Sequence, residues 1–216
     1  MRILILGAGA IGGYFGARLI EGGANVSYLV RPGRAAQLKK DGLVVESCFG
    51  NLSLPLAESQ IVEKATETYD LILLSCKAYD LDSAIEAIRP AVGPSTTVLP
   101  LLNGIRHVTE LQKQFKEERV LGGFCIISST LADTGKIIHF NNAHTLKFGE
   151  FSGEESERIK AIKAVFQPAK MDWKASPDIS RDMWEKWVMI ASLAATTCLM
   201  RASVGQVARS PGGKEF

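Results

Sequence analysis

A glycine-rich turn near the N-terminus has the clearest chemical role in this sequence. Residues 7–12 follow the pattern G-x-G-x-x-G, directly after an apolar run at 2–6. Between a buried strand and a helix, Gly7 permits a tight turn, Gly9 admits a pyrophosphate and Gly12 lets the helix pack on the strand. The helix N-terminus then attracts the phosphates. A turn without a ligand is the alternative. The residues predicted to bind a dinucleotide are Gly7, Ala8, Gly9, Ala10, Ile11 and Gly12.

The end of the next expected strand, residues 25–30, bears on the choice between NAD and NADP. An NAD site usually has an acidic residue there, which binds the ribose 2′-hydroxyl. This chain has Arg31, and the next three residues include no acid. Because a guanidinium binds a phosphate with paired hydrogen bonds, the sequence predicts NADP as the cofactor. A solvated surface arginine is the alternative.

Polar residues also follow two further apolar runs. Lys77 comes after the run 70–75, and Asn103-Gly104 comes after the run 96–102. Ligands of parallel sheets bind outside the carboxyl ends of the strands, where both residues would lie beside the glycine turn. We therefore expect Lys77 and Asn103 to contact the cofactor. A solvated lysine and a simple turn are the alternatives.

The order of elements predicts an α/β fold, with an N-terminal Rossmann-type doubly wound parallel sheet covered on both faces. Short apolar runs typical of buried strands alternate with segments of helical spacing. The expected strands are 2–6, 25–30, 70–75 and 96–102, and the expected helices are 14–21, 80–89 and 105–117. Arg31-Pro32-Gly33 is expected to end the second strand.

From about residue 119 the pattern changes to strands with few helices between them. We expect strands at 120–127, 136–140, 145–148 and 171–175, turns at Gly135 and at Asn141-Asn142, and helices at 154–166 and 180–199. We place a domain boundary at residue 176. Residues 1–176 would form the NADP-binding Rossmann domain, and residues 177–216 would begin an all-helical domain that is truncated.

Composition and charge exclude several classes of protein. Apolar residues make up 46% of the 216 residues, charged residues 22%, and the net charge is +2. These values are typical of a globular protein and give no sign of nucleic-acid or membrane binding. The four cysteines and three histidines form no zinc pattern, so we expect no metal and reduced thiols in a cytoplasmic protein. The longest apolar stretch, 187–200, is too short to span a bilayer.

The motifs at 7–12, 31, 77–80, 102–104 and 184–187 occur in the order seen in ketopantoate reductases, and the chain resembles that family over nearly its whole length. The resemblance implies a Rossmann domain, an all-helical C-terminal domain and an active site in the cleft between them. It implies NADPH-dependent reduction of 2-dehydropantoate, a small 2-keto acid, to pantoate. That reaction belongs to pantothenate and coenzyme A biosynthesis.

By the same resemblance, Lys186 corresponds to the family's catalytic lysine. Lys77 corresponds to a lysine near the cofactor, and Asn103 to an asparagine that contacts cofactor and substrate. A cation beside the ketone oxygen can stabilise the alkoxide formed by hydride transfer and then supply the proton. A lysine that snorkels from an apolar helix is the alternative for Lys186.

The chain departs from the family pattern at two substrate-facing positions. The family's asparagines after the lysine correspond to Ile190 and Ala194. Apolar groups would thus face the substrate where the family has hydrogen-bonding groups, so a different 2-keto acid or related ketone could be the substrate.

The chain also departs from the family in length. The family continues for on the order of a hundred residues past Gly205, including an acidic residue that helps to anchor the substrate. Trp187, Leu193 and Leu199 therefore need a partner surface, from another subunit through this helix or from further chain. If the chain ends at residue 216, we expect cofactor binding with weak or absent turnover.

Two other classes of function remain open at this point. One is a dinucleotide-binding module without catalysis, such as a redox sensor or a truncated relic. The other is an opine-type or 3-hydroxy acid dehydrogenase, which would use a histidine or a differently placed lysine as the acid. His107 is the nearby candidate, but its position predicts a solvent-facing histidine on a helix.

Overall fold

Two sheets organise the chain, whose computed structural model describes residues 1–215. Sheet A is parallel throughout, in the order β5-β2-β1-β6-β7. The strand order reverses between β1 and β6, which confirms the predicted Rossmann-type doubly wound sheet. Its strands are β1 (Arg2–Leu6), β2 (Asn25–Leu29), β5 (Ile61–Val62), β6 (Leu71–Leu74) and β7 (Thr97–Pro100).

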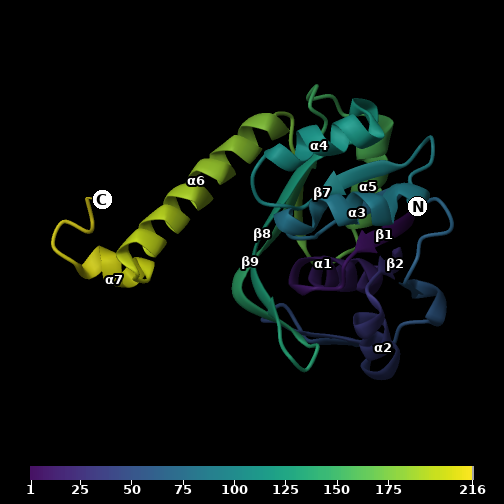
Figure 1. The fold of residues 1–216 in the computed structure, drawn as a ribbon, viewed down its shortest axis with the longest axis horizontal. Coiled ribbons are helices and arrows are strands. Elements are labelled where there is room, and N and C mark those ends of the chain that lie inside the picture. The colour runs from purple at the N-terminus through teal and green to yellow at the C-terminus, as the bar shows by residue number, and fades with distance from the viewer. Residues whose placement is uncertain (216) are drawn as a thin grey trace.

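Helices cover sheet A on both faces, because side chains of both faces are apolar. On one face, Leu4 packs in a core with α3 (Leu81–Ile88) and α4 (Arg106–Phe115). On the other face, Ile3 and Ile5 pack in a core with α1 (Ala10–Glu21). Figure 1 shows α3 and α4 on one side of β1 and α1 on the other. The continuous apolar run at the N-terminus is thus a strand buried on both faces.

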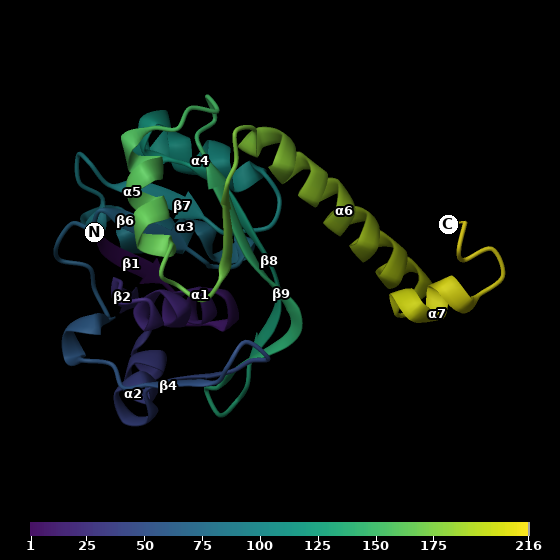
Figure 2. The same ribbon diagram turned by 180° about the vertical axis from the view of Figure 1, so that it is seen from behind.

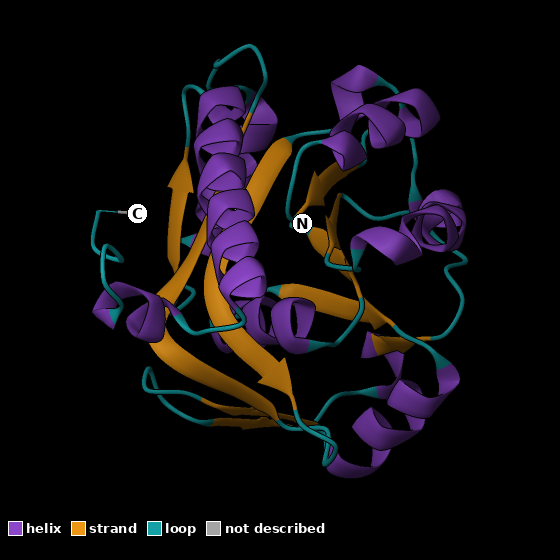
Figure 3. Cartoon of the chain, turned by 60° about the vertical axis from the view of Figure 1, so that its left-hand side comes forward, coloured by secondary structure: helices purple, strands orange, loops and turns teal. Residues whose placement is uncertain are grey.

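Sheet B encloses α1 from the side opposite sheet A. Residues of α1 share one core with residues of β3, β9 and α5. Figure 2 shows α1 close to the long strands of this sheet, and Figure 3 shows helices flanking the strands. The strands are β3 (Leu43–Glu46), β4 (Leu52–Leu54), β8 (Gly122–Leu131), β9 (Ile137–Gly149) and β10 (Asp172–Ala175), and the helix is α5 (Glu157–Phe166).

One expectation for this region is wrong: the expected strands 136–140 and 145–148 form the single strand β9. Asn141-Asn142, expected as a turn, lies inside it. The pairing of β8 with β9 is irregular between Ile127 and Ser129. At that irregularity, Asn141 Oδ1 accepts hydrogen bonds from the Ser128 N–H at 3.3 Å and from His139 Nε2 at 3.1 Å. The Asn141 side chain therefore supplies local hydrogen bonds where the ladder is interrupted.

The helix that directly follows β2 was not predicted from the sequence. Arg31-Pro32-Gly33 ends the strand as predicted, but Arg31 is also the N-cap residue of α2 (Pro32–Asp41). Proline is favourable at the first helical position, since it has no N–H to leave unpaired and its φ is already helical. The short strands β3, β4 and β5 were also missed. Four 3₁₀ turns lie between the strands and helices of the α/β body: η1 (Glu58–Gln60), η2 (Ala78–Asp80), η3 (Arg89–Ala91) and η4 (Glu117–Arg119).

The predicted long C-terminal helix is α6 (Ile179–Met200), and the shorter α7 (Val204–Arg209) follows it. Asp178 begins α6 by accepting a hydrogen bond from the Arg181 N–H. Ile179, Met183 and Lys186 are the buried residues of α6, and they share one helix face. Figure 1 shows α6 extending away from the α/β body, and its residues after Lys186 are exposed or half-buried. In residues 1–215, no helix is long and apolar enough to cross a membrane.

Candidate active site

The glycine turn connects β1 to α1. Its backbone conformation at Gly7 and its close packing at Gly12 both favour glycine over other residues. Gly7 has a φ of +91°, which other residues rarely adopt, and its N–H donates to the Leu29 carbonyl at 2.9 Å. Gly12 lies in the first turn of α1. A Cβ there would come within 2.3 Å of both the Gly7 carbonyl oxygen and Ser75 Oγ. Glycine at position 12 therefore allows the close packing of helix and strand.

A cavity of about 490 Å³ opens beside this turn, at the carboxyl ends of β1, β2 and β6. Gly7, Ala8 and Gly9 line it, whereas Ala10 and Ile11 form the start of α1 behind them. A Cβ on Gly9 would meet no atom within 4 Å, so the backbone there faces open space. The open glycine, the helix N-terminus and the cavity fit the diphosphate of a dinucleotide.

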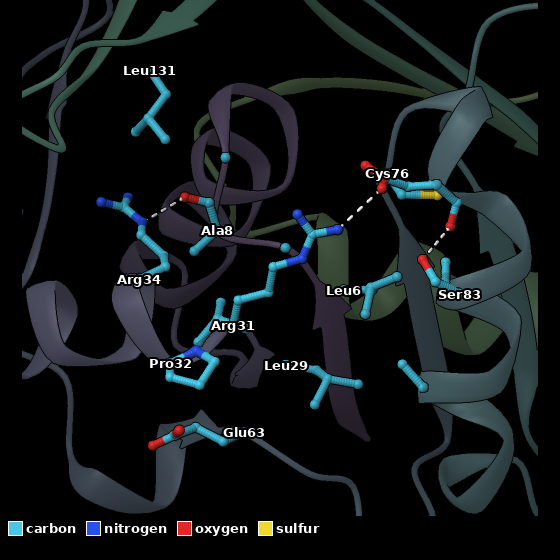
Figure 4. A pocket seen from close by; sticks show the side chains of 16 residues that line it. Leu6, Ala8, Leu29, Arg31, Pro32, Arg34, Glu63, Cys76, Ser83 and Leu131 are labelled. Carbon is cyan, nitrogen blue, oxygen red and sulfur yellow. Dashed lines mark hydrogen bonds and ion pairs between the residues drawn. The ribbon is translucent and has the colours of Figure 1, made fainter.

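Two guanidiniums lie in the wall of this cavity. Arg31, expected at the cofactor phosphate, extends across the opening and forms an ion pair with Asp80, with 3.0 Å between Nη2 and Oδ1. Arg34 lies beside it (Figure 4). Its Nε donates to the Ala8 carbonyl at 3.0 Å, and its Nη1 to the Gly135 carbonyl at 2.9 Å. Arg34 therefore ties the glycine turn to the β8–β9 turn, a role that the sequence did not indicate.

Lys77 and Asn103 lie at the same edge of sheet A as the glycine turn. Lys77 is exposed at the start of η2, between Cys76, which lines the first cavity, and Ala78, which lines a second cavity of about 670 Å³. Asn103 follows β7 and lines the second cavity. The structure thus brings both residues to the carboxyl ends of the strands, but Lys77 lines neither cavity.

Lys186 is buried where α6 leaves the α/β body. Its Nζ donates to Asn103 Oδ1 at 2.9 Å and to the Cys125 carbonyl at 2.7 Å, and lies 5.1 Å from the centre of the Phe124 ring. Burial lowers the pKa of Lys186 below its ordinary value of 10.5. A lysine that snorkels would have its ammonium group in solvent. Lys186 is buried and its Nζ is hydrogen-bonded, so it does not snorkel. The carbonyl of Cys125 was missed, because a main-chain acceptor leaves no signal in a sequence.

His107 is buried, so the expectation of a solvent-facing histidine is wrong. The residue lies in the first turn of α4 and is 4% exposed. Burial, reinforced by the positive charge of Lys186, lowers its pKa to about 4. A histidine with this pKa is neutral near pH 7, so His107 is not a charged imidazolium that could act as the general acid there.

Ile190 and Ala194 continue the helix face of Lys186, one and two turns further along α6. Ile190 is half-buried and Ala194 is exposed. Neither residue lines the two cavities. The structure therefore aligns them with Lys186 without bringing them to the glycine turn.

The fold and this site define an oxidoreductase of the dinucleotide-binding class. Residues 3–153 match the family of ketopantoate reductase PanE/ApbA, which is most of the chain. The chain therefore belongs to the ketopantoate reductase family.

Named relatives agree with this family. The chain is 39% identical to the uncharacterized oxidoreductase YkpB of Bacillus subtilis, over 99% of this chain and 70% of that protein. It is 26% identical to the 2-dehydropantoate 2-reductase of Aquifex aeolicus, over 100% of this chain and 68% of that protein. The chain thus spans about 70% of the length of these relatives.

Solved structures show the same fold. The 2-dehydropantoate 2-reductase of Geobacter metallireducens is 30% identical with a TM-score of 0.90, over 100% of this chain and 71% of that chain. The ternary structure of D-mandelate dehydrogenase with NADH and anilino(oxo)acetate is 22% identical, with a TM-score of 0.86, over 100% of this chain and 69% of that chain. At 22% identity, the similarity to D-mandelate dehydrogenase shows a shared fold alone.

Proposed function

We propose that this protein reduces the ketone of a 2-keto acid with NADPH. The proposed substrate is 2-dehydropantoate, in pantothenate and coenzyme A biosynthesis in the cytoplasm. The observation that carries the proposal is the buried Lys186 ammonium, held by Asn103 Oδ1 and the Cys125 carbonyl. An ammonium has three N–H groups, and within residues 1–215 the structure shows acceptors for two. In this proposal the third donates to the ketone oxygen of the substrate.

Each residue of the proposed site has a distinct task. A bound reduced nicotinamide supplies the hydride. Lys186 stabilises the negative charge that develops on the ketone oxygen and donates the proton that completes the alcohol. The lowered pKa of Lys186 makes that proton easier to transfer. Asn103 holds the ammonium in place and contacts cofactor and substrate.

The proposed cofactor site runs along the first cavity. The residues 7–12 of the glycine turn bind the diphosphate, and Arg31 binds the 2′-phosphate of NADP. The exposed Lys77 adds positive charge at the same edge. Support for NADP comes from Arg31 at the end of β2 and its place in the cavity wall. In this proposal residues 1–176 bind the cofactor, and residues 177–216 begin the helical substrate domain.

Reduction of a different 2-keto acid is the second candidate. It is favoured by Ile190 and Ala194, the apolar residues on the Lys186 face of α6. A site that offers an apolar contact where a substrate hydroxyl needs a partner discriminates against that hydroxyl. We propose that Asn103, Lys186, Ile190 and Ala194 face the substrate, which would then carry an apolar group beside its keto acid.

The test is NADPH oxidation by the purified protein with 2-dehydropantoate and with a panel of 2-keto acids that vary in the side chain. Oxidation with 2-dehydropantoate at the highest kcat/KM supports the first candidate. A higher kcat/KM with an apolar 2-keto acid supports the second. NADPH binding without oxidation of any substrate would instead identify a binding module. Sedimentation of the same sample tests whether the exposed apolar face of α6 joins two subunits.

A further inference from the structure

One ion pair spans the opening of the cofactor cavity. Arg31 Nη2 lies 3.0 Å from Asp80 Oδ1. Arg31 caps α2 after β2, and Asp80 ends η2 after β6, so the pair joins two walls of the cavity on either side of the glycine turn. Figure 4 shows the Arg31 side chain extended toward the wall of the cavity that holds Cys76.

Arg31 differs from the other guanidinium in the cavity wall in how it is held. Arg34 is half-buried and donates to the backbone carbonyls of Ala8 and Gly135, so it is part of the framework. The Arg31 side chain is 81% exposed, and Asp80 is its one ion-pair partner among residues 1–215. Because exposed ion pairs are weak, this contact can exchange for a better anion.

We propose that Asp80 is a specificity-determining residue for the cofactor, because its carboxylate competes with the adenosine 2′-phosphate for Arg31. The inference rests on the proposed use of NADPH. A phosphate carries more negative charge than a carboxylate and matches the guanidinium fork, so it displaces Asp80. Asp80 then lies unpaired beside the phosphate and repels it. NADH has no 2′-phosphate, so Asp80 does not repel it in this way. Asp80 therefore reduces the preference of the site for NADPH over NADH.

The chain provides a matched control for this effect. Glu63 is the other carboxylate in the cavity wall, and its nearest cation is Lys39, at 3.6 Å. Asp80→Asn and Glu63→Gln each remove one negative charge and keep the side-chain size. Only Asp80→Asn releases Arg31. A gain confined to Asp80→Asn therefore separates competition for Arg31 from a general change in the charge of the cavity.

The test is calorimetric titration with adenosine 2′,5′-bisphosphate and with AMP, two probes that differ by the 2′-phosphate alone. We expect Asp80→Asn to tighten binding of the bisphosphate by roughly three- to tenfold and to change AMP binding by less than about twofold. Glu63→Gln should change both by less than about twofold. In an Arg31→Met background, the gain from Asp80→Asn should disappear, because the group for which the two anions compete is absent.

The outcomes separate this inference from the proposal on which it rests. If the unmodified protein binds both probes equally and Arg31→Met changes neither, the use of NADPH is wrong and the inference falls with it. If Arg31→Met removes a preference for the bisphosphate but Asp80→Asn leaves binding unchanged or weakens it, Asp80 does not compete and the inference alone is overturned. A gain of equal size in Glu63→Gln, or one that survives Arg31→Met, overturns it as well.

Discussion

The Lys186 ammonium lies 2.9 Å from Asn103 Oδ1, although the two residues are 83 positions apart in the chain. Asn103 follows β7 at the carboxyl edge of sheet A, and Lys186 lies on the buried face at the start of α6. A carboxamide accepts a hydrogen bond without adding negative charge. Asn103 can therefore hold the ammonium in place without the rise in pKa that a carboxylate would cause.

Replacement of Lys186 by methionine should abolish reduction while the cofactor still binds. The methionine side chain keeps the apolar contacts but provides neither charge nor proton, so kcat should fall about a hundredfold to ten-thousandfold. Steady-state kinetics and NADPH titration of the same sample check the two halves of this prediction. Full activity of Lys186→Met would show that Lys186 is not the catalytic acid.

The rate of reduction should depend on pH through the pKa of Lys186, which burial lowers. The protonated lysine is the acid, so the rate should fall as the pH rises through its pKa, and burial moves that limb below 10.5. Asn103→Asp would place a carboxylate beside the ammonium and should move the limb to higher pH. A pH–rate profile of the two proteins measures the shift. An unchanged limb would mean that another group limits the rate.

Alanine substitutions in the glycine turn should separate folding from cofactor binding. In Gly12→Ala, the new Cβ would come within 2.3 Å of the Gly7 carbonyl oxygen, which should cost about 1–3 kcal/mol of stability. In Gly9→Ala, the Cβ would meet no atom of residues 1–215 within 4 Å, and the loss of stability should stay below about 1 kcal/mol, from the poorer N-cap of α1.

Cofactor titration completes this comparison. The Gly9→Ala methyl group would occupy the space where we place the diphosphate, and it should weaken NADPH binding by at least about tenfold. Thermal melting and NADPH titration measure the two effects. Tight binding by Gly9→Ala would show that the dinucleotide does not approach the turn at this residue.

Acid should destabilise the protein through His107. Its pKa is about 4 in the folded state, against 6.5 when the side chain is solvated. Between these values the unfolded chain binds more protons, so the free energy of unfolding falls as the pH falls through this window, by roughly 3 kcal/mol in total.

His107→Gln should remove this dependence and leave a shallower acid limb. Burial also lowers the pKa of His144, which contributes a loss of the same sign in both proteins. Denaturant titrations of the two proteins at pH values across the window measure the difference. If the free energy of unfolding falls with pH equally in the two proteins, the pKa of His107 does not differ between the folded and unfolded states.

Local sequence signals predicted four of the five strands of sheet A, but they missed β5 and, in sheet B, β3, β4 and the continuity of β9. The strands of sheet A are buried on both faces, and their apolar runs identify them directly. In β9, Asn141-Asn142 carries a turn signal, yet Asn141 bonds to Ser128 and His139 across and along the strand. The β8–β9 pairing is interrupted at this point, between Ile127↔His144 and Ser129↔His139, and the Asn141 side chain bridges the gap to Ser128. That bridge joins two strands, so no local signal in the sequence predicts it.

Residues that are neighbours in the chain were enough to predict the alternation of strands and helices, the glycine turn after the first strand and a lysine on the long C-terminal helix. The sequence did not show that Lys186 binds Asn103 and the Cys125 carbonyl, that Asp80 binds Arg31, or that His107 is buried. Those relationships join different elements. Distances between elements, and the loss of water around each charge, follow from packing and not from sequence spacing, so these contacts are seen only in the folded chain.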